Sequence, residues 1–194
     1  MRKLIVSNLI SLDGYAAGPG GNMMVLPLDE SFSARNVELL REAGTLLLGA
    51  STYRGFSEYW PQVAADPDQP PVEHEIAEIN GRLDKVVVSD TLAPEEIGAW
   101  RESTEIVRRA DAHARIAELK EQDGGDIVMF GSITLAHDLV NAGLVDEVHL
   151  MVGAGVLGDG VAALPPLAPG TLTLIEARQL EGSSNVLMRY AVSQ

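Results

Sequence analysis

The stretch DIVMFGSITLAHDLVNAG, residues 126–143, decides the fold class of this 194-residue chain. After Asp126, residues 127–130 are wholly apolar, which is typical of a strand buried on both faces of a sheet. Gly131 follows, and residues 132–143 repeat apolar side chains with helical spacing. A buried strand that turns at once into a helix is the repeating element of α/β proteins.

The same alternation continues on both sides of this stretch. Further strands are expected at residues 2–9, 45–49, 85–89, 104–108 and 145–153, and helices at 29–43, 71–83 and 111–121. Two more strand-like runs, 171–180 and 185–193, are joined by EGSS and indicate an antiparallel hairpin. We therefore expect an α/β sheet that is mostly parallel, with an antiparallel C-terminal edge.

Three segments rich in glycine or proline, residues 11–28, 61–71 and 165–169, are interpreted as loops rather than linkers. With 194 residues and no repeat, the chain is expected to form a single domain spanning 1–194.

Composition argues against several classes of function. With 14 basic and 28 acidic residues, the chain would repel DNA or RNA, so nucleic acid is not an expected partner. The chain has no cysteine and only four scattered histidines, so neither a disulfide nor a metal site is expected. No apolar run reaches the ~20 residues of a membrane span, and LIVSNLI (4–10) is too short for a signal peptide. The expected location is the cytoplasm.

Two glycine motifs are interpreted as false matches. GAGVLG (153–158) fits G-x-G-x-x-G, but that motif requires a helix directly after it, and residues 159–170 hold too many prolines and glycines. GASTY (49–53) lacks the last glycine of a G-x-S-x-G nucleophile elbow, so no serine-hydrolase triad is indicated.

A better anion site lies at Gly131 and Ser132, where free N–H groups and the positive end of a helix dipole meet a strand end. Ser132 and Thr134 could also donate hydroxyl hydrogen bonds, and Gly131→Val should block a ligand while leaving the fold intact. The alternative is a simple turn with Ser132 as N-cap. Residues 49–52 repeat the feature after another strand, and two such turns would make one crevice.

Four stretches occur in a familiar order: SLDGYAAGPGG (11–21), LLLGASTYRGFSEYWP (46–61), KVVVSDTL (85–92) and the run from 126 to 160. Together they resemble the dihydrofolate reductase superfamily, over nearly the whole chain. The likeness is greatest to the branch that holds the reductase domain of the riboflavin-pathway deaminase/reductase and its stand-alone relatives. The resemblance implies a three-layer α/β/α fold around an eight-stranded sheet and the cofactor NADPH, with NADH also possible.

The resemblance also implies where the dinucleotide would lie. It places residues from two turns around the pyrophosphate: Gly49, Ala50, Ser51 and Thr52, and Gly131, Ser132, Ile133, Thr134 and Leu135. It places Ser89 near the adenosine ribose and the backbone of Leu9, Ala16 and Ala17 against the nicotinamide. Folate-reducing members often carry arginine where this chain has Ala50, and a basic or neutral residue where it has Asp90. We expect NADPH and NADH affinities within about tenfold, unless Arg54 or Arg108 replaces these anchors.

Asp29, in LPLD (26–29), stands where folate reductases place a buried carboxylate, so it is the candidate proton donor. The alternative is an N-cap or first-turn acid of the helix at 29–43. Met151 stands where folate enzymes carry a threonine, which argues against folate as the substrate.

Three more residues are candidates for the substrate side of the site. Asp13 either orders the loop over the nicotinamide or forms an Asx turn. Tyr53 and Trp60 are either core or loop-anchoring aromatics, or a wall on which a substrate stacks.

The favoured function is an NAD(P)H-dependent oxidoreductase that transfers hydride to a small planar heterocycle, pteridine-like or pyrimidine-like, or to a related carbonyl or imine compound. One alternative is the riboflavin-pathway 5-amino-6-(5-phosphoribosylamino)uracil reductase, although its sugar phosphate should need basic anchors, and the N-terminal half offers few besides Arg54 and Arg82. A third possibility is a dinucleotide- or ligand-binding protein without turnover.

A homodimer joined through the end of the sheet is expected, both from the resemblance and from the apolar residues of the last two strands, Leu174, Leu180, Leu187 and Tyr190. The alternative is a monomer in which the loops 61–71 and 156–170 cover that edge.

Overall fold

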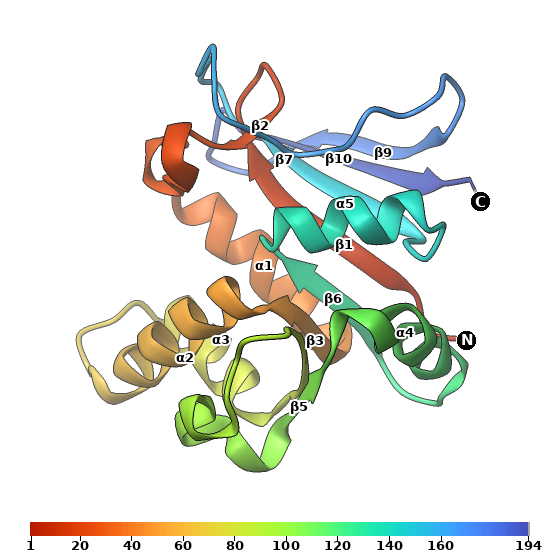
Figure 1. Ribbon diagram of the computed structural model, residues 1–194. Helices are drawn as coiled ribbons and strands as arrows, with labels where there is room; N and C mark the ends of the chain where they lie inside the picture. Colours follow the sequence, from red (N-terminus) through yellow and green to blue (C-terminus); the bar gives the residue numbers. More distant parts are fainter. Residues whose placement is uncertain (194) are drawn as a thin grey trace. The chain divides into compact units, whose positions relative to one another are not determined.

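The computed structural model describes residues 1–193 (Figure 1). The chain forms two compact units. The first contains Met1–Arg2 and Ser33–Ser132, and the second contains Lys3–Phe32 and the chain from Ile133 onward.

The first unit is built on four parallel strands in the order β5-β4-β3-β6. They are β3 (Ala43–Gly49), β4 (Asp84–Val88), β5 (Thr104–Val107) and β6 (Asp126–Phe130). Leu46, Leu47 and Leu48 of β3 are completely buried, as expected for a strand covered on both faces. The helices are α2 (Ala50–Ala65), α3 (Pro71–Arg82), α4 (Ala112–Glu121) and most of α1 (Glu30–Glu42), with 3-10 segments η3 (Pro94–Ser103) and η4 (Arg109–Asp111).

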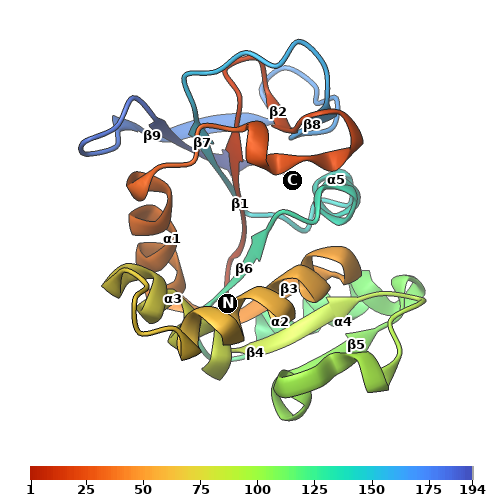
Figure 2. The same cartoon turned by 90° about the vertical axis from the view of Figure 1, so that its left-hand side faces the viewer.

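Helix α2 corrects the expectation of a loop over 61–71, because it continues through Pro61 to Ala65, and α3 already begins at Pro71. Helices α2 and α3 lie beside each other (Figure 2). The sequence pattern misses α2 because Gly55 and Pro61 are poor helix formers. Pro61 sits close to the C-terminus, where it removes only the amide that would bond to the carbonyl of Ser57, and the last turn still forms.

The second unit contains strands in the order β1-β7-β10-β9. β1 (Leu4–Ile10) runs parallel to β7 (Glu147–Val152), whereas β10 (Val186–Val192) and β9 (Leu172–Gln179) are antiparallel additions, which confirms the C-terminal hairpin. A short pair joins β2 (Tyr15–Ala17) to β8 (Val161–Ala162), and α5 covers Ile133–Asn141. The segment expected as a loop over 11–28 also contains the 3-10 turns η1 (Pro19–Gly21) and η2 (Met23–Val25).

A cluster of buried side chains forms the core on one face of this second set of strands: Leu9, Leu26, Met151, Leu180 and Leu187. Leu180 and Leu187 were expected on the exposed edge, and that expectation is wrong. Leu187 is 1% exposed because its position in β10 directs it toward Met151, its partner in β7.

The predicted class is confirmed: the two units supply the eight strands of an α/β protein, mostly parallel and with antiparallel C-terminal strands. The assignment of residues 1–194 to one domain stays a prediction. In the part of the chain that the structure describes, no helix is long and apolar enough to cross a membrane.

Candidate functional site

Two strands of the first unit end at turns that contain a glycine and residues with hydroxyl side chains. Gly49 is the last residue of β3 and the N-cap of α2, whereas Gly131 and Ser132 follow β6 and lead into α5. The carboxyl ends of parallel strands meet at one edge of a sheet, which is where α/β proteins bind ligands.

The structure brings these two turns into direct contact. Ser132 Oγ accepts a hydrogen bond of 2.9 Å from the Gly49 amide and donates one of 2.9 Å to Thr52 Oγ1. The Ser132 amide also donates to Thr52 Oγ1, at 3.2 Å. Thr52 therefore accepts twice, and its own hydroxyl proton is not used within the trio formed by Gly49, Thr52 and Ser132.

The backbone at this turn is unusual. Gly131 has φ +58° and Ser132 has φ +50°, and among residues 1–193 Ser132 is the only non-glycine residue with a positive φ. An ordinary N-cap has extended backbone, so Ser132 departs from the simple N-cap alternative. Left-handed serine is strained by roughly 1–3 kcal/mol and persists where surrounding bonds hold it, often at a ligand site.

The N-terminus of α2 offers open donors. Its N-cap, Gly49, makes no side-chain cap, and its first turn carries no acidic residue. The first-turn amides of Ala50, Ser51 and Thr52 are therefore available to an anionic oxygen, and the helix dipole favours it. A Cβ on Gly131 would reach ordinary van der Waals contact with Thr52 Oγ1, at 3.4 Å, so it is the positive φ of residue 131 that favours glycine there. These residues fit the pyrophosphate of a dinucleotide.

Ser89 follows β4 directly and is a buried turn former, since its Oγ accepts hydrogen bonds from the amides of Thr91 and Leu92. The next residue, Asp90, lies beside two arginines. Its carboxylate accepts a 3.1 Å hydrogen bond from the Arg109 amide, with Arg109 Nε 3.7 Å from the other oxygen. Arg108 donates to the Asp90 carbonyl.

Arg108 and Arg109 therefore lie next to Asp90, so this position holds two cations as well as the acid that the sequence shows. Arg108 was one of the two candidates to replace the missing anchors, and Arg109 was missed. The signal is the Arg-Arg pair directly after β5. The other candidate, Arg54, is held by Glu96 at 2.9 Å.

In the second unit, Asp13 joins two loops. Its carboxylate accepts hydrogen bonds from the amides of Leu157 (3.1 Å) and Gly158 (2.7 Å). The hydrogen bond from the Ser11 hydroxyl, followed by those from the Gly158 and Leu157 amides, lowers the pKa of Asp13 to about 2. The GAGVLG segment leads into loop and β8 rather than into a helix, so its interpretation as a loop is confirmed.

Asp29 has the geometry of a helix cap. Its Oδ1 accepts hydrogen bonds from the Ser31 amide (3.0 Å) and hydroxyl (2.5 Å), and its Oδ2 accepts one of 2.5 Å from the Ser183 hydroxyl. Partial burial acts to raise the pKa of this carboxyl, but the hydrogen bonds from Ser183 and Ser31 outweigh it and the pKa is lowered. This arrangement matches the N-cap alternative, and the role of proton donor stays a prediction.

The remaining backbone candidates also lie in the second unit. Leu9 is part of the buried core, and Ala16 and Ala17 belong to β2. Gly160 packs so tightly on Ala17 that a Cβ would lie 2.1 Å from its carbonyl oxygen. The first three residues of α5 are Ile133, Thr134 and Leu135.

The two aromatic candidates differ. Tyr53 is completely buried, and its hydroxyl donates a 2.7 Å hydrogen bond to the carbonyl of Ile97, so it is a core aromatic. Trp60 is half-buried and packs against Phe56 and Tyr59 of the same helix. Of the two aromatic candidates, Trp60 alone can still face a substrate, and this role stays a prediction.

Comparison with known proteins identifies the family. The model of the RibD C-terminal domain matches residues 2–186. The chain belongs to the RibD C-terminal domain family. A curated relative, the uncharacterized protein YyaP of Bacillus subtilis (strain 168), is 27% identical over 161 residues, which are 82% of this chain and 78% of that protein.

Solved structures show the same fold. A diaminohydroxyphosphoribosylaminopyrimidine deaminase/5-amino-6-(5-phosphoribosylamino)uracil reductase from Thermotoga maritima matches with a TM-score of 0.69 and 12% identity, covering 99% of this chain and 57% of that one. Dihydrofolate reductase from Enterococcus faecalis, complexed with NADP(H) and RAB-propyl, matches with a TM-score of 0.59 and 13% identity over 99% of this chain and 97% of that one. The resemblance to the dihydrofolate reductase superfamily, and to its RibD branch, is confirmed.

Proposed function

We propose that this protein is an NADPH-dependent reductase that transfers hydride to a small planar nitrogen heterocycle. The observation that carries the proposal is the hydrogen-bonded trio of Gly49, Thr52 and Ser132 beside the open N-terminus of α2. This arrangement supplies amide and hydroxyl donors to a pyrophosphate without requiring a basic side chain. Membership of the RibD C-terminal domain family supports a reductase.

Each candidate residue has a role in this proposal. Residues 49–52 and 131–135 would hold the pyrophosphate, Ser89 would lie near the adenosine ribose, and the backbone of Leu9, Ala16 and Ala17 would face the nicotinamide. The nicotinamide would supply the hydride, and the protein would supply binding, orientation and exclusion of water. In residues 1–193 no group of three His, Asp or Glu side chains could hold a metal ion.

The second candidate is the 5-amino-6-(5-phosphoribosylamino)uracil reductase activity that the name of the Thermotoga maritima protein states. Its substrate carries a phosphate that would need a cation. Arg54 is already paired with Glu96, so we favour an unphosphorylated heterocycle. A dinucleotide-binding protein without turnover is the third candidate. A cytoplasmic location and a homodimer are also part of the proposal.

Titration of the purified protein with NADPH, followed by the absorbance of the reduced nicotinamide in the presence of pteridines, pyrimidines and quinones, tests the proposal. We expect saturable NADPH binding and oxidation with at least one planar heterocycle. Binding without oxidation by any acceptor would favour the binding protein, and oxidation only with the phosphoribosyl pyrimidine would favour the second candidate. Absence of NADPH binding would overturn the proposal.

A further inference from the structure

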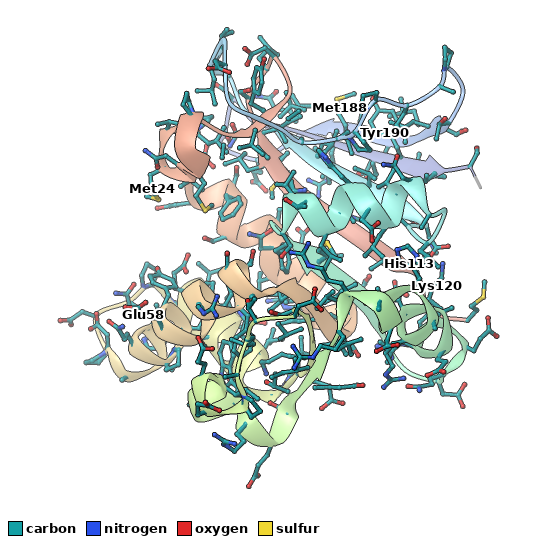
Figure 3. The ribbon with its side chains drawn as sticks, viewed as in Figure 1. Met24, Glu58, His113, Lys120, Met188 and Tyr190 are labelled. Atoms are coloured by element: carbon teal, nitrogen blue, oxygen red, sulfur yellow. The ribbon has the colours of Figure 1, made fainter. Side chains whose placement is uncertain are left out.

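A cavity of about 520 Å³ lies at the amino ends of the parallel strands of the first unit, the edge of the sheet opposite to Gly49 and Ser132. Its lining comes from the first residues of β3, β4 and β5, from α4 and the turn after it, and from Arg2. Figure 3 labels His113 and Lys120 on α4, the helix that contributes to this lining. None of the residues assigned to the dinucleotide lines the cavity, so it is a separate candidate site.

Arg2 is a buried cation in the wall of this cavity. It is 7% exposed, and it donates hydrogen bonds of 2.6 Å from Nε to the Gly125 carbonyl and of 2.6 Å from Nη2 to Thr45 Oγ1. Both acceptors are neutral, and no carboxylate in residues 1–193 forms an ion pair with Arg2. Burial lowers the pKa of Arg2, and the charges of Asp126 and Asp84 act against this effect. Because a buried charge is costly without a counter-ion, Arg2 favours an anionic group in the cavity.

Lys85 is a second buried cation of the lining. It is 1% exposed, and its amine donates to the Leu83 carbonyl at 2.6 Å and to Ser103 Oγ at 3.3 Å. Burial lowers the pKa of Lys85 to about 8, so the amine is mostly protonated at pH 7. Since these two oxygens already hold the amine, Lys85 adds positive charge to the wall, whereas Arg2 is the group expected to contact a ligand.

Acidic side chains line the same cavity. Arg115 neutralises one of them, since its Nε and Nη2 donate hydrogen bonds of 2.9 Å to the two oxygens of Glu105. Asp84, Glu102 and Asp123 are exposed, and no cation of the described chain forms an ion pair with any of these three. They do not form a metal site, because residues 1–193 contain no group of three acids or histidines that could hold a metal ion.

The charges of the lining select the kind of ligand. With the Arg115–Glu105 pair neutral, two buried cations accompany three exposed carboxylates. The carboxylates would repel a free phosphate, and Arg2 and Lys85 would repel a polyamine that has no acidic group. A zwitterion with its anionic group toward Arg2 and its cationic groups toward the exposed acids satisfies both sets, and a net charge of +1 balances the lining. A basic α-amino acid has this distribution of charge.

We propose that this cavity binds a basic α-amino acid such as lysine or arginine. The Arg2 guanidinium binds the α-carboxylate, because charge-assisted hydrogen bonds from arginine to carboxylates are strong. The carboxylates of Asp84, Glu102 and Asp123 bind the cationic groups at the exposed side. This inference goes beyond the proposed function, because the cavity shares no residue with the candidate dinucleotide site.

Calorimetric titration of the full chain with L-lysine tests the proposal, and two shortened ligands identify the groups that bind. Cadaverine is lysine without its carboxylate, and 6-aminohexanoate is lysine without its α-amino group. We expect saturable binding of one L-lysine per chain. Each shortened ligand should bind about tenfold more weakly or worse, because each lacks a charge-assisted hydrogen bond.

Substitutions locate the ligand. Asp84→Asn and Asp123→Asn change exposed side chains, so folding is not threatened, and each should weaken lysine binding about threefold to tenfold. Arg2→Met removes the guanidinium and should weaken it about tenfold or more. Because Arg2 is buried, the comparison of lysine with cadaverine takes the place of Arg2→Met if that variant does not fold. Asp68→Asn, at an exposed position between α2 and α3, is the matched control and should leave lysine binding unchanged.

Three results would overturn the inference. Absence of L-lysine binding would show that the cavity is not such a site. Equal affinities for L-lysine and cadaverine would show a general attraction of cations to an acidic protein. Parental lysine affinity in both Asp84→Asn and Asp123→Asn would place the ligand outside this cavity.

Discussion

Ser132 Oγ donates a 2.9 Å hydrogen bond to Thr52 Oγ1, although 80 residues separate the two side chains in the sequence. Because Ser132 also accepts from the Gly49 amide, one hydroxyl group ties the turn after β6 to the start of α2. The positions of both turns are therefore fixed before any ligand arrives, which lowers the entropy lost on binding.

Thr52→Val tests this tie. The variant keeps the shape of the side chain but leaves the Ser132 hydroxyl and amide without their acceptor. Each hydrogen bond contributes a net ~1 kcal/mol, so we expect the free energy of unfolding to fall by about 2 kcal/mol and NADPH affinity to fall about tenfold. Chemical denaturation and NADPH titration measure the two effects. Thr173→Val, at an exposed position in β9, is the matched control and should change neither.

Gly131→Val, in contrast, is not the clean test that the sequence suggests. At φ +58° a β-branched residue is strained, so we expect Gly131→Val to lower the stability of the protein as well as to block the ligand. The sequence shows that residue 131 is a glycine, which would let a ligand approach the backbone. It does not show that this glycine has a positive φ, and that φ is what makes valine unfavourable there.

We propose that Asp90 lowers the preference for NADPH over NADH. Its carboxylate lies 3.7 Å from Arg109 Nε and would repel a 2′-phosphate. We expect the parent protein to bind NADPH and NADH with affinities within about tenfold of each other, which corresponds to a difference of at most ~1.4 kcal/mol in binding free energy. Asp90→Asn removes the negative charge, so we expect it to raise the preference for NADPH about fivefold or more. The control Asp68→Asn changes the net charge equally from an exposed loop. Equal NADPH:NADH ratios in parent and Asp90→Asn would remove Asp90 from the site.

Asp13 gives a pH dependence whose direction follows from its lowered pKa. Its folded pKa of about 2 lies below the ordinary value of about 4, so the carboxylate supports the loop above pH 4 and this support is lost as pH falls toward 2. We expect the amide resonances of Leu157 and Gly158 to be constant from pH 5 to 8 and to shift only near pH 2.

Asp13→Asn should remove this shift and speed amide exchange at Leu157 and Gly158 already at neutral pH. Asp159→Asn, in the same loop, accepts only from the neighbouring Gly160 amide and serves as the control. If the two amides titrate near pH 4 instead, the hydrogen bonds to Asp13 do not persist in solution.

Two substitutions at Asp29 distinguish a role in helix capping from a role as proton donor. Asparagine caps helices as well as aspartate, whereas alanine does not, so Asp29→Ala should lower the free energy of unfolding by about 1 kcal/mol and Asp29→Asn by much less. Because the pKa of Asp29 is lowered, it is ionised at neutral pH, and we expect Asp29→Asn to retain most reductase turnover. Loss of turnover in Asp29→Asn, with parental stability and NADPH affinity, would instead identify Asp29 as the proton donor.

How far the sequence reaches depends on the physics of each feature. Apolar runs such as Leu46–Leu48 and the period of residues 132–143 locate strands and helices because burial sets those patterns. The sequence pattern does not predict helix α2 because this helix contains Gly55 and Pro61, which are both poor helix formers. The Ser132–Thr52 bond and the arginines beside Asp90 depend on distances across the fold, and no local pattern reports them.

The last prediction concerns assembly through β9. In the described part of the chain β9 has only β10 as a neighbour, and it exposes Leu174 (53%) and Ile175 (47%). Leu174 is in register with Tyr190 of β10, which lies on the same strand as Met188 (Figure 3). An edge strand with such side chains invites pairing, and a defined second copy is the usual way to cover it.

We expect light scattering to give twice the 20.7 kDa mass of the chain, and Leu174→Lys to shift the protein toward the monomer, because a buried unpaired lysine at a symmetric interface is present twice. Met24→Lys is the matched control. Met24 is 73% exposed and lies in η2 rather than on the edge strand (Figure 3), so this variant should remain a dimer. A parent protein that is monomeric at every concentration would contradict the dimer and leave the fold and the Ser132–Thr52 site untouched, since neither depends on a second copy at β9.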